Sequence, residues 1–192
     1  MDKKRNKQIN YSNVIATIGT SILAITALIT VYITVSAWSE EREANRPYFT
    51  FKDSPSVELK ESPVFEIQFT NVGEHPAVGL WSKSVVFSTD LKEHPITVDE
   101  YALVNDIPKN AYATLMISLN GLKNKETVGE IKPHFIVIVL KYEDPIINQR
   151  FDQTLYIKWN GVQNGENLAT VHAEAYEKTM ILEYFKENKI SF

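Results

Sequence analysis

Histidine is the residue type in this chain best suited to chemistry, because it serves both as a metal ligand and as a general base near neutral pH. The chain has four histidines and no cysteine. No two of the histidines stand at the spacing of a zinc-ligand pair, and the lack of cysteine excludes a thiolate site or a cysteine nucleophile. The sequence therefore predicts no metal centre at His75, His94, His134 or His172.

Adjacent acidic residues are the other candidates for acid–base chemistry. Asp99 with Glu100, and Glu143 with Asp144, fall in predicted turns, where acidic residues are common for structural reasons. The sequence contains no phosphate-binding P-loop, no G-x-S-x-G nucleophile motif and no dinucleotide-binding fingerprint. We therefore predict that the protein is not an enzyme and binds no cofactor.

The turn "NVGEHPA" at residues 71–77 and the tryptophan that follows it form the predicted contact surface. Asn71 and Gly73 suit a tight turn, and His75 precedes a proline, for which we expect an exposed loop position. Trp81 has two interpretations: a buried aromatic of the core, or an exposed anchor of a binding surface. Its burial separates them, and Asn71, Gly73, His75 and Trp81 are the candidate partner-contact residues.

A long uncharged segment precedes these residues, between Lys7 and Glu40. As a helix, residues 14–38 would span about 37 Å, against roughly 30 Å of bilayer hydrocarbon. The segment is too long for the apolar core of a cleaved signal peptide, and a buried core helix rarely lacks charge for so long. We predict a transmembrane helix after a basic tail at residues 1–13. Aromatic residues expected to anchor it at the interface are Tyr11, Tyr32 and Trp38.

Basic residues predict the orientation of this helix. Four Lys or Arg stand in the 13 residues before it and three in the 15 residues after it. The positive-inside rule then places the N-terminus in the cytoplasm and the following domain outside it. Together with the absence of cysteine, this predicts a single-pass protein of the bacterial inner (cytoplasmic) membrane, with an extracytoplasmic domain.

One face of the membrane helix carries small residues at helical spacing: Ala16, Thr20, Ala24 and Ala27. Such a face lets two helices approach closely, and it predicts a homo-oligomer through the membrane segment. The alternative is that the hydroxyl groups bond to carbonyl groups of their own helix and face lipid. Beyond the span, residues 39–46 are mostly helix formers up to Pro47, and they predict a short helical stalk.

The periodicity of the sequence changes to two beyond the stalk. Apolar and polar side chains alternate in residues 63–73, 111–119 and 150–159, and residues 134–142 are apolar at nearly every position, as in a central strand. This predicts a mainly β domain at residues 47–165, either an antiparallel immunoglobulin-like sandwich or a small barrel. An amphipathic helix within residues 166–192 is expected to pack on it, with partner or membrane contact as the alternatives.

Three short motifs carry a resemblance. They are Arg46 and Pro47 after the membrane helix, Asn71 and Gly73 with Pro76 and Ala77 between two strands, and Tyr142 and Asp144 at the start of a hairpin. With them the chain resembles a loose group of uncharacterised bacterial single-pass membrane proteins with an immunoglobulin-like β-sandwich domain. The resemblance covers most of residues 46–160. It implies a fold and a membrane setting, and it implies no activity.

These observations predict a membrane-tethered, non-enzymatic interaction module whose partners are the lipid bilayer and a membrane or envelope protein. Residues 47–192 contain 20 acidic residues against 14 basic ones, which disfavours nucleic acid as a partner. One alternative is a ligand-gated effector or sensor, for example antiviral and nucleotide-sensing, with a cytoplasmic β domain. An anionic nucleotide needs Arg and Lys in its pocket. Beyond Arg46, Arg150 is the one arginine in the sequence, which weighs against this alternative. A further alternative is an accessory subunit of a larger membrane complex.

Overall fold

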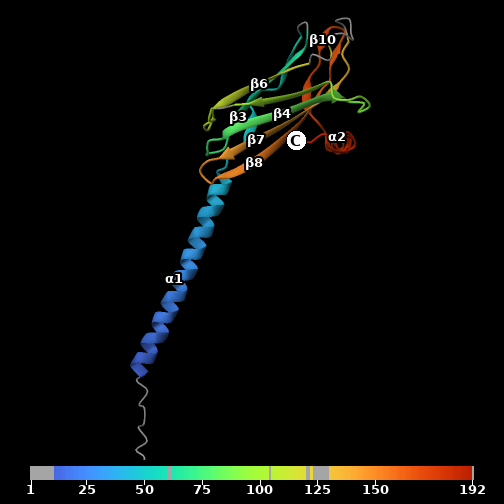
Figure 1. Cartoon of the computed structure of the whole chain (residues 1–192). Helices are drawn as coiled ribbons and strands as arrows, with labels where there is room; N and C mark the ends of the chain where they lie inside the picture. Colours follow the sequence, from blue (N-terminus) through green and yellow to red (C-terminus); the bar gives the residue numbers. More distant parts are fainter. Residues whose placement is uncertain (1–10, 60–61, 104, 120–121, 123–129, 192) are drawn as a thin grey trace, which may run out of the picture. The chain divides into compact units, whose positions relative to one another are not determined.

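A computed structural model gives the structure of the chain and describes residues 11–59, 62–103, 105–119, 122 and 130–191. The chain divides into two compact units, Met1–Ala44 and Asn45–Phe192. Figure 1 shows the first as a long helix and the second as a set of sheets with one further helix. The prediction of a mainly β, antiparallel fold between an apolar N-terminal helix and a C-terminal helix is confirmed.

The first unit is helix α1 (Tyr11–Ala44). Its segment Val14–Ala44 is long and apolar enough to cross a membrane. Large apolar side chains such as Ile15, Leu23 and Leu28 are exposed along it. The helix runs past Trp38 without a break and ends at Ala44, so residues 39–44 of the predicted stalk are helical, whereas residues 45–46 lie beyond the helix.

Hydroxyl groups of α1 bond within the helix itself. Five of them donate to the carbonyl oxygen four residues earlier, at 2.8–2.9 Å: Thr20, Ser21, Thr26, Thr30 and Thr34. This is the alternative that the sequence left open for these side chains. The hydroxyl of Thr20 therefore needs no partner helix, while association through the small-residue face at Ala16, Ala24 and Ala27 stays a prediction.

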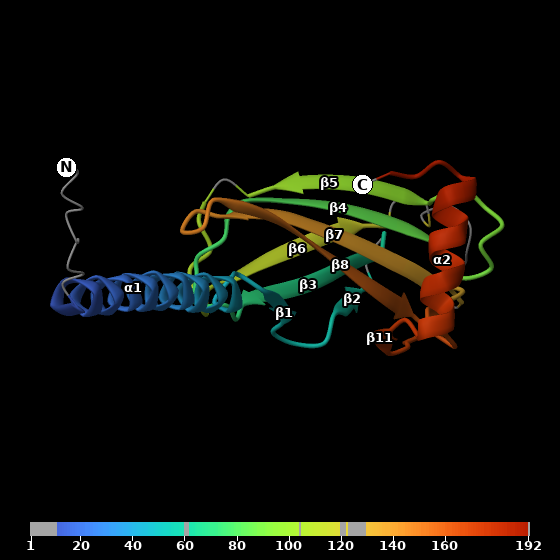
Figure 2. The ribbon, with the colours of Figure 1, turned by 90° about the horizontal axis from the view of Figure 1, so that it is seen from below.

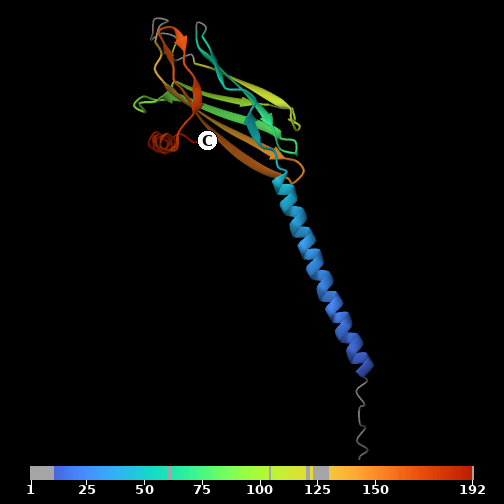
Figure 3. The same ribbon diagram turned by 180° about the vertical axis from the view of Figure 1, so that it is seen from behind.

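The second unit is built on two antiparallel sheets, which lie one over the other in Figures 1 and 3. The four-stranded sheet has β3 (Val64–Asn71) in its middle, with β6 (Tyr112–Ser118) on one side and both β1 (Phe49–Phe51) and β2 (Ser56–Glu58) on the other. The five-stranded sheet runs β11 (Thr170–His172), β8 (Gln149–Trp159), β7 (His134–Asp144), β4 (Val78–Ser88), β5 (Thr97–Ala102). A small hairpin joins β9 (Val162–Gln163) to β10 (Glu166–Asn167).

One apolar core lies between the two sheets. Phe65 and Ile67 of β3 meet Ile136 and Ile138 of β7 in it, and Trp159 of β8 is fully buried there. The alternation predicted within residues 63–73 is observed as strictly alternating burial along β3. Strand β7 is buried on both faces for most of its length, as predicted for a central strand.

Helix α2 (Ala175–Glu187) covers the other face of the five-stranded sheet (Figure 2). Tyr184 stacks on Phe87 of β4 with 4.8 Å between ring centroids. The Nζ of Lys158 on β8 donates to Glu177 Oε1 at 2.6 Å. Burial raises the pKa of Glu177, but hydrogen bonds from Lys158 and from the backbone of Glu174 outweigh it, so the pKa is lowered overall. The expected packing of the C-terminal helix on the sheets is therefore observed.

His134 opens β7 inside the domain, where its ring lies over Trp159 with 6.0 Å between centroids. Within the described residues, no group hydrogen-bonds its Nδ1. Burial lowers the pKa of His134, and a bond to the Lys132 backbone and the charge of Asp90 offset this in part. The folded protein therefore holds this histidine neutral at a pH where the unfolded chain protonates it.

We expect the stability of the domain to fall as the pH drops below about 6.5, because only the unfolded chain then takes up the proton of His134. The free energy of unfolding should decrease by up to about 1.4 kcal/mol per pH unit from this group. His134→Phe keeps the ring stacking and should flatten this dependence, whereas His94→Phe, at an exposed residue, should leave it unchanged. Urea unfolding of the detergent-solubilised chain measures the free energy of unfolding across this pH range. If this free energy changes equally with pH in the wild type and in His134→Phe, His134 is not the group responsible.

Candidate functional site

Residues 45–49 run from the end of α1 to the first residue of β1, and we call them the connector. The connector is bonded to other parts of the domain, beginning with Asn45. The carbonyl oxygen of Asn45 accepts the N–H of His75 at 2.9 Å, and that of Tyr48 accepts the N–H of Val72 at 2.8 Å. The N–H of Phe49 donates to the Gln153 side chain of β8 at 3.0 Å. The connector is therefore hydrogen-bonded to the rest of the domain from Asn45 to Phe49.

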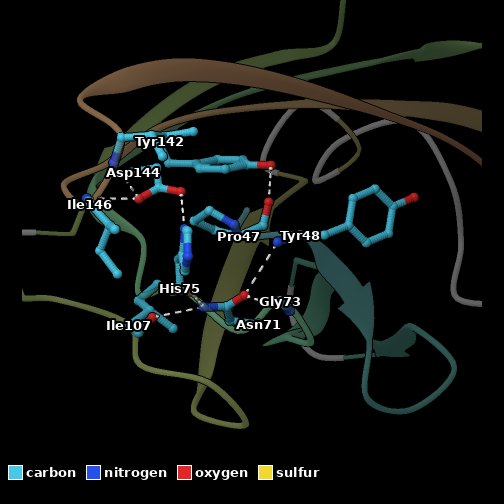
Figure 4. Close-up of polar contacts among 10 residues, drawn as sticks. Pro47, Tyr48, Asn71, Gly73, His75, Ile107, Tyr142, Asp144 and Ile146 are labelled. Carbon is cyan, nitrogen blue, oxygen red and sulfur yellow. Dashed lines mark hydrogen bonds and ion pairs between the residues drawn. The ribbon is translucent and has the colours of Figure 1, made fainter. Parts of the chain in front are cut away.

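Asn71 at the end of β3 holds the connector through its side chain (Figure 4). Its Oδ1 accepts the N–H groups of Tyr48 at 3.2 Å and Gly73 at 3.0 Å. Its Nδ2 donates to the carbonyl oxygens of His75 at 2.8 Å and Ile107 at 3.0 Å. The residue is 0% exposed, and one buried amide thus satisfies four backbone groups from three other segments of the chain.

Gly73 is required by a close approach of the connector. A Cβ atom built on it would lie 2.1 Å from the carbonyl oxygen of Arg46 and 2.7 Å from the Cα of Pro47. Both are backbone atoms, so no side-chain rotation can relieve the overlap. The sequence expectation of a tight turn at Asn71 and Gly73 is met, and the structure adds that this turn fits against the connector.

A buried contact between a histidine and an aspartate lies beside the turn. His75 Nδ1 is 2.6 Å from Asp144 Oδ2, and the two residues are 8% and 0% exposed. Asp144 Oδ1 accepts the N–H of Ile146 at 2.9 Å and so also closes the β7–β8 turn. The Tyr142 hydroxyl donates to the carbonyl oxygen of Pro47 at 3.1 Å, and burial raises the pKa of Tyr142 to about 12. The Tyr142 hydroxyl therefore stays protonated and keeps its bond to the connector.

We call this set of side chains the clasp: Asn71, Gly73, His75, Tyr142 and Asp144. Its polar groups bond to one another and to backbone groups, as Figure 4 shows. A histidine beside a carboxylate is the orientation used by general bases, but apart from the His75–Asp144 contact the clasp side chains bond to backbone carbonyl and N–H groups. The arrangement is suited to holding the connector in place. The described residues contain no group of three His, Asp or Glu able to hold a metal ion.

Two of the predicted contact residues are corrected by the structure. We expected His75 in an exposed loop and Asn71 at a partner surface, but both are buried and bonded inside the clasp. Gly73 is partly buried against the connector. The Asn71 amide makes four hydrogen bonds inside the clasp and cannot contact another protein without breaking them.

Trp81 fits neither of its two interpretations fully, because it is half-buried. Strand β4 bends before it: Gly79 has a φ of +60°, and the register shifts between Val78 and Trp81. Leu80 enters the core, while the Trp81 ring lies under the Lys141 ammonium, 5.2 Å from its centroid. The tryptophan that fills the core is Trp159.

A cavity of about 400 Å³ adjoins Trp81 and combines both signs of charge. Lys141 and Arg150 line it together with Glu143 and Asp152. The guanidinium of Arg150 pairs with Glu143 at 3.5 Å, and its side chain is 87% exposed. A nucleotide phosphate needs an excess of cationic donors, so this cavity does not favour the nucleotide-sensing alternative.

The sequence carries a signal for the clasp: polar residues on the buried faces of β3 and β7. Asn71 shares the buried face of β3 with Phe65, Ile67 and Phe69, and a polar residue on such a face must find partners. Asp144 ends β7 on the face of Tyr142 by the same alternation. The sequence analysis instead placed Asp144 in a turn. What the alternation cannot show is that these two side chains meet through His75.

Comparison with known proteins adds little to this geometry. No protein-family model matches the chain, and no curated protein sequence matches it. Among solved structures, it is similar to a beta-glucosidase from Streptomyces venezuelae in complex with D-glucose, with 12% identity and a TM-score of 0.28. That match covers 57% of the present chain, which spans 15% of the length of the enzyme. We transfer neither fold nor activity from it.

Replacing Asn71 by alanine should destabilise the domain by about 2–4 kcal/mol, because it leaves two buried carbonyl groups, those of His75 and Ile107, and two part-buried N–H groups without their partner. Asn71→Asp should also destabilise, since a carboxylate cannot donate to the carbonyl oxygens of His75 and Ile107. The exposed Asn105 supplies the control Asn105→Ala, for which we expect a change within about 0.5 kcal/mol. Urea unfolding measures all three; an Asn71→Ala variant as stable as the control would show that the clasp contributes nothing.

Proposed function

We propose that the protein is a membrane-tethered, non-enzymatic interaction module. In this proposal α1 anchors the chain in the bilayer, and the β domain contacts a membrane or envelope protein. The observation that carries it is the clasp: it binds the connector at Asn45, the first residue after the helix. A long flexible linker would let a domain sample many positions, whereas here the first residue after the helix already bonds to the domain.

The tether is also short. Six helical residues, 39–44, separate Trp38 from the connector and rise by about 9 Å, which is similar to the thickness of one headgroup layer. Lost translational and rotational freedom is a main cost of association. Tethering lowers that cost for a partner in the same membrane, because it raises the effective concentration.

The finer assignments belong to the same proposal. We infer an immunoglobulin-like sandwich for the two sheets, supported by their common core and by the resemblance of the three motifs. We infer the bacterial cytoplasmic membrane with the N-terminus inside and the domain outside, supported by the excess of basic residues before the span.

The contact surface we propose is the exposed rim that the clasp positions. Val72 and Glu74 stand on the β3–β4 turn beside Asn71, and both are exposed. Ile146 is exposed on the β7–β8 turn, whose N–H is held by Asp144. The buried clasp residues then act indirectly, by fixing the loops that carry these side chains.

Photocrosslinking in native membranes tests this function. A photoreactive amino acid at Val72 should capture a membrane or envelope protein, whereas the same group at Val171 should not; both valines are 46% exposed. A reporter active only in the cytoplasm, fused after residue 192, should stay silent. Equal capture at the two positions would contradict the proposed surface, and an active reporter would reverse the topology and favour a cytoplasmic sensor.

A further inference from the structure

Strand β6 is an open edge of the four-stranded sheet. It pairs with β3 over all seven of its residues, from Tyr112 to Ser118. Among the strands that the structure describes, none pairs with its other side; at its end, the carbonyl oxygen of Ser118 accepts the hydroxyl of Thr97 at 3.4 Å. The outer N–H and C=O groups of such an edge are a template for one more strand.

The other edges of the two sheets carry the features that block strand pairing. Strands β1, β2 and β11 are three residues long, and short edges pair weakly. Strand β5 has Asp99 and Glu100 in its middle, and charge protects an edge. The sequence of β6, "YATLMIS", has no charge, no proline and no glycine. It is the longest uncharged edge among the described strands. The outer side of β8 also has no strand partner over residues 149–156, but Arg150 and Asp152 place charges there.

The side chains of β6 also suit a neighbouring strand. Leu115 and Ile117 are buried on the inner face, while Tyr112 and Met116 on the outer face are 60% and 56% exposed. Aromatic and long apolar side chains gain contact area from a cross-strand neighbour. The exposed face therefore offers apolar contacts in addition to the backbone groups of the edge.

We propose that β6 pairs antiparallel with β6 of a second copy of this chain. The register that pairs all seven residues is centred on Leu115, which then faces its own copy. Thr114 lies opposite Met116, and Ala113 opposite Ile117, so a small residue meets a larger one on each face. No like charges meet in this register, and like charges placed directly opposite are destabilising.

The second copy is favoured over a different strand for two reasons. Two identical antiparallel edges form a two-fold contact, which uses up both edges and closes the assembly as a dimer. Tethering in one membrane also raises the effective concentration of the copies; this step rests on the proposed function. The two-fold contact and the raised effective concentration act against the repulsion between two copies of residues 47–192, each of which has 20 acidic and 14 basic residues.

Cysteine crosslinking tests the pairing directly, because the chain has no cysteine of its own. In native membranes, the double variant Thr114→Cys/Met116→Cys should form disulfide-linked dimers on oxidation, since each new thiol faces one of the other copy. The matched control on β5 is Val98→Cys/Glu100→Cys, with the same spacing on an exposed edge. We expect roughly ten-fold less dimer from the control, as its contacts are random collisions.

Adding a charge gives the second measurement. Met116→Lys places a gatekeeper charge on an exposed position and should abolish the dimer without unfolding the domain. A dimer that survives Met116→Lys but is lost in Ala24→Leu would assign association to the membrane helix and overturn the proposal. Crosslinking of β6 to a different protein, or equal yields from β5 and β6, would also overturn it. Resistance of the protein to alkaline extraction tests the membrane tether separately. A failure of β6 pairing can therefore be distinguished from a failure of the proposed membrane anchoring.

Discussion

Four hydrogen bonds converge on the buried amide of Asn71, and they link segments that are distant in the sequence. The connector, the β3–β4 turn and the chain near Ile107 each place a backbone group against it. For the two groups in fully buried bonds, the carbonyl groups of His75 and Ile107, the loss of this partner costs about 1–3 kcal/mol each. These segments therefore cannot move apart independently, and the position of the connector is tied to the end of β3.

The rest of the domain builds outward from this constraint. Strand β3 carries the clasp at one end and supplies Phe65 and Ile67 to the core. Its neighbour β6 supplies the open edge, while Asp144 carries the same restraint to the five-stranded sheet through His75. A contact made at the exposed turns thus reaches both sheets through bonded, buried groups.

The sequence predicted those parts of the fold that depend on local patterns. Alternation predicted β3 and the burial of its apolar face, and continuous apolarity predicted β7 as a central strand, because the period of side chains in a strand is local. The burial of His75 could not be predicted in this way, since it depends on Asp144, 69 residues further along the chain. Trp81 was uncertain for a related reason: the bend at Gly79 sets its exposure, and no period describes a bulge.

Amide hydrogen exchange of the full chain in lipid measures the central claim most directly, namely that the connector belongs to the cooperative unit of the domain. The N–H groups of Tyr48, Phe49 and Val72 are bonded to Asn71, Gln153 and Tyr48 respectively. We expect them to exchange only with unfolding of the domain, as slowly as the central amides of β7. Exchange of these three amides at the rate of an unstructured peptide, with β7 still protected, would contradict the account.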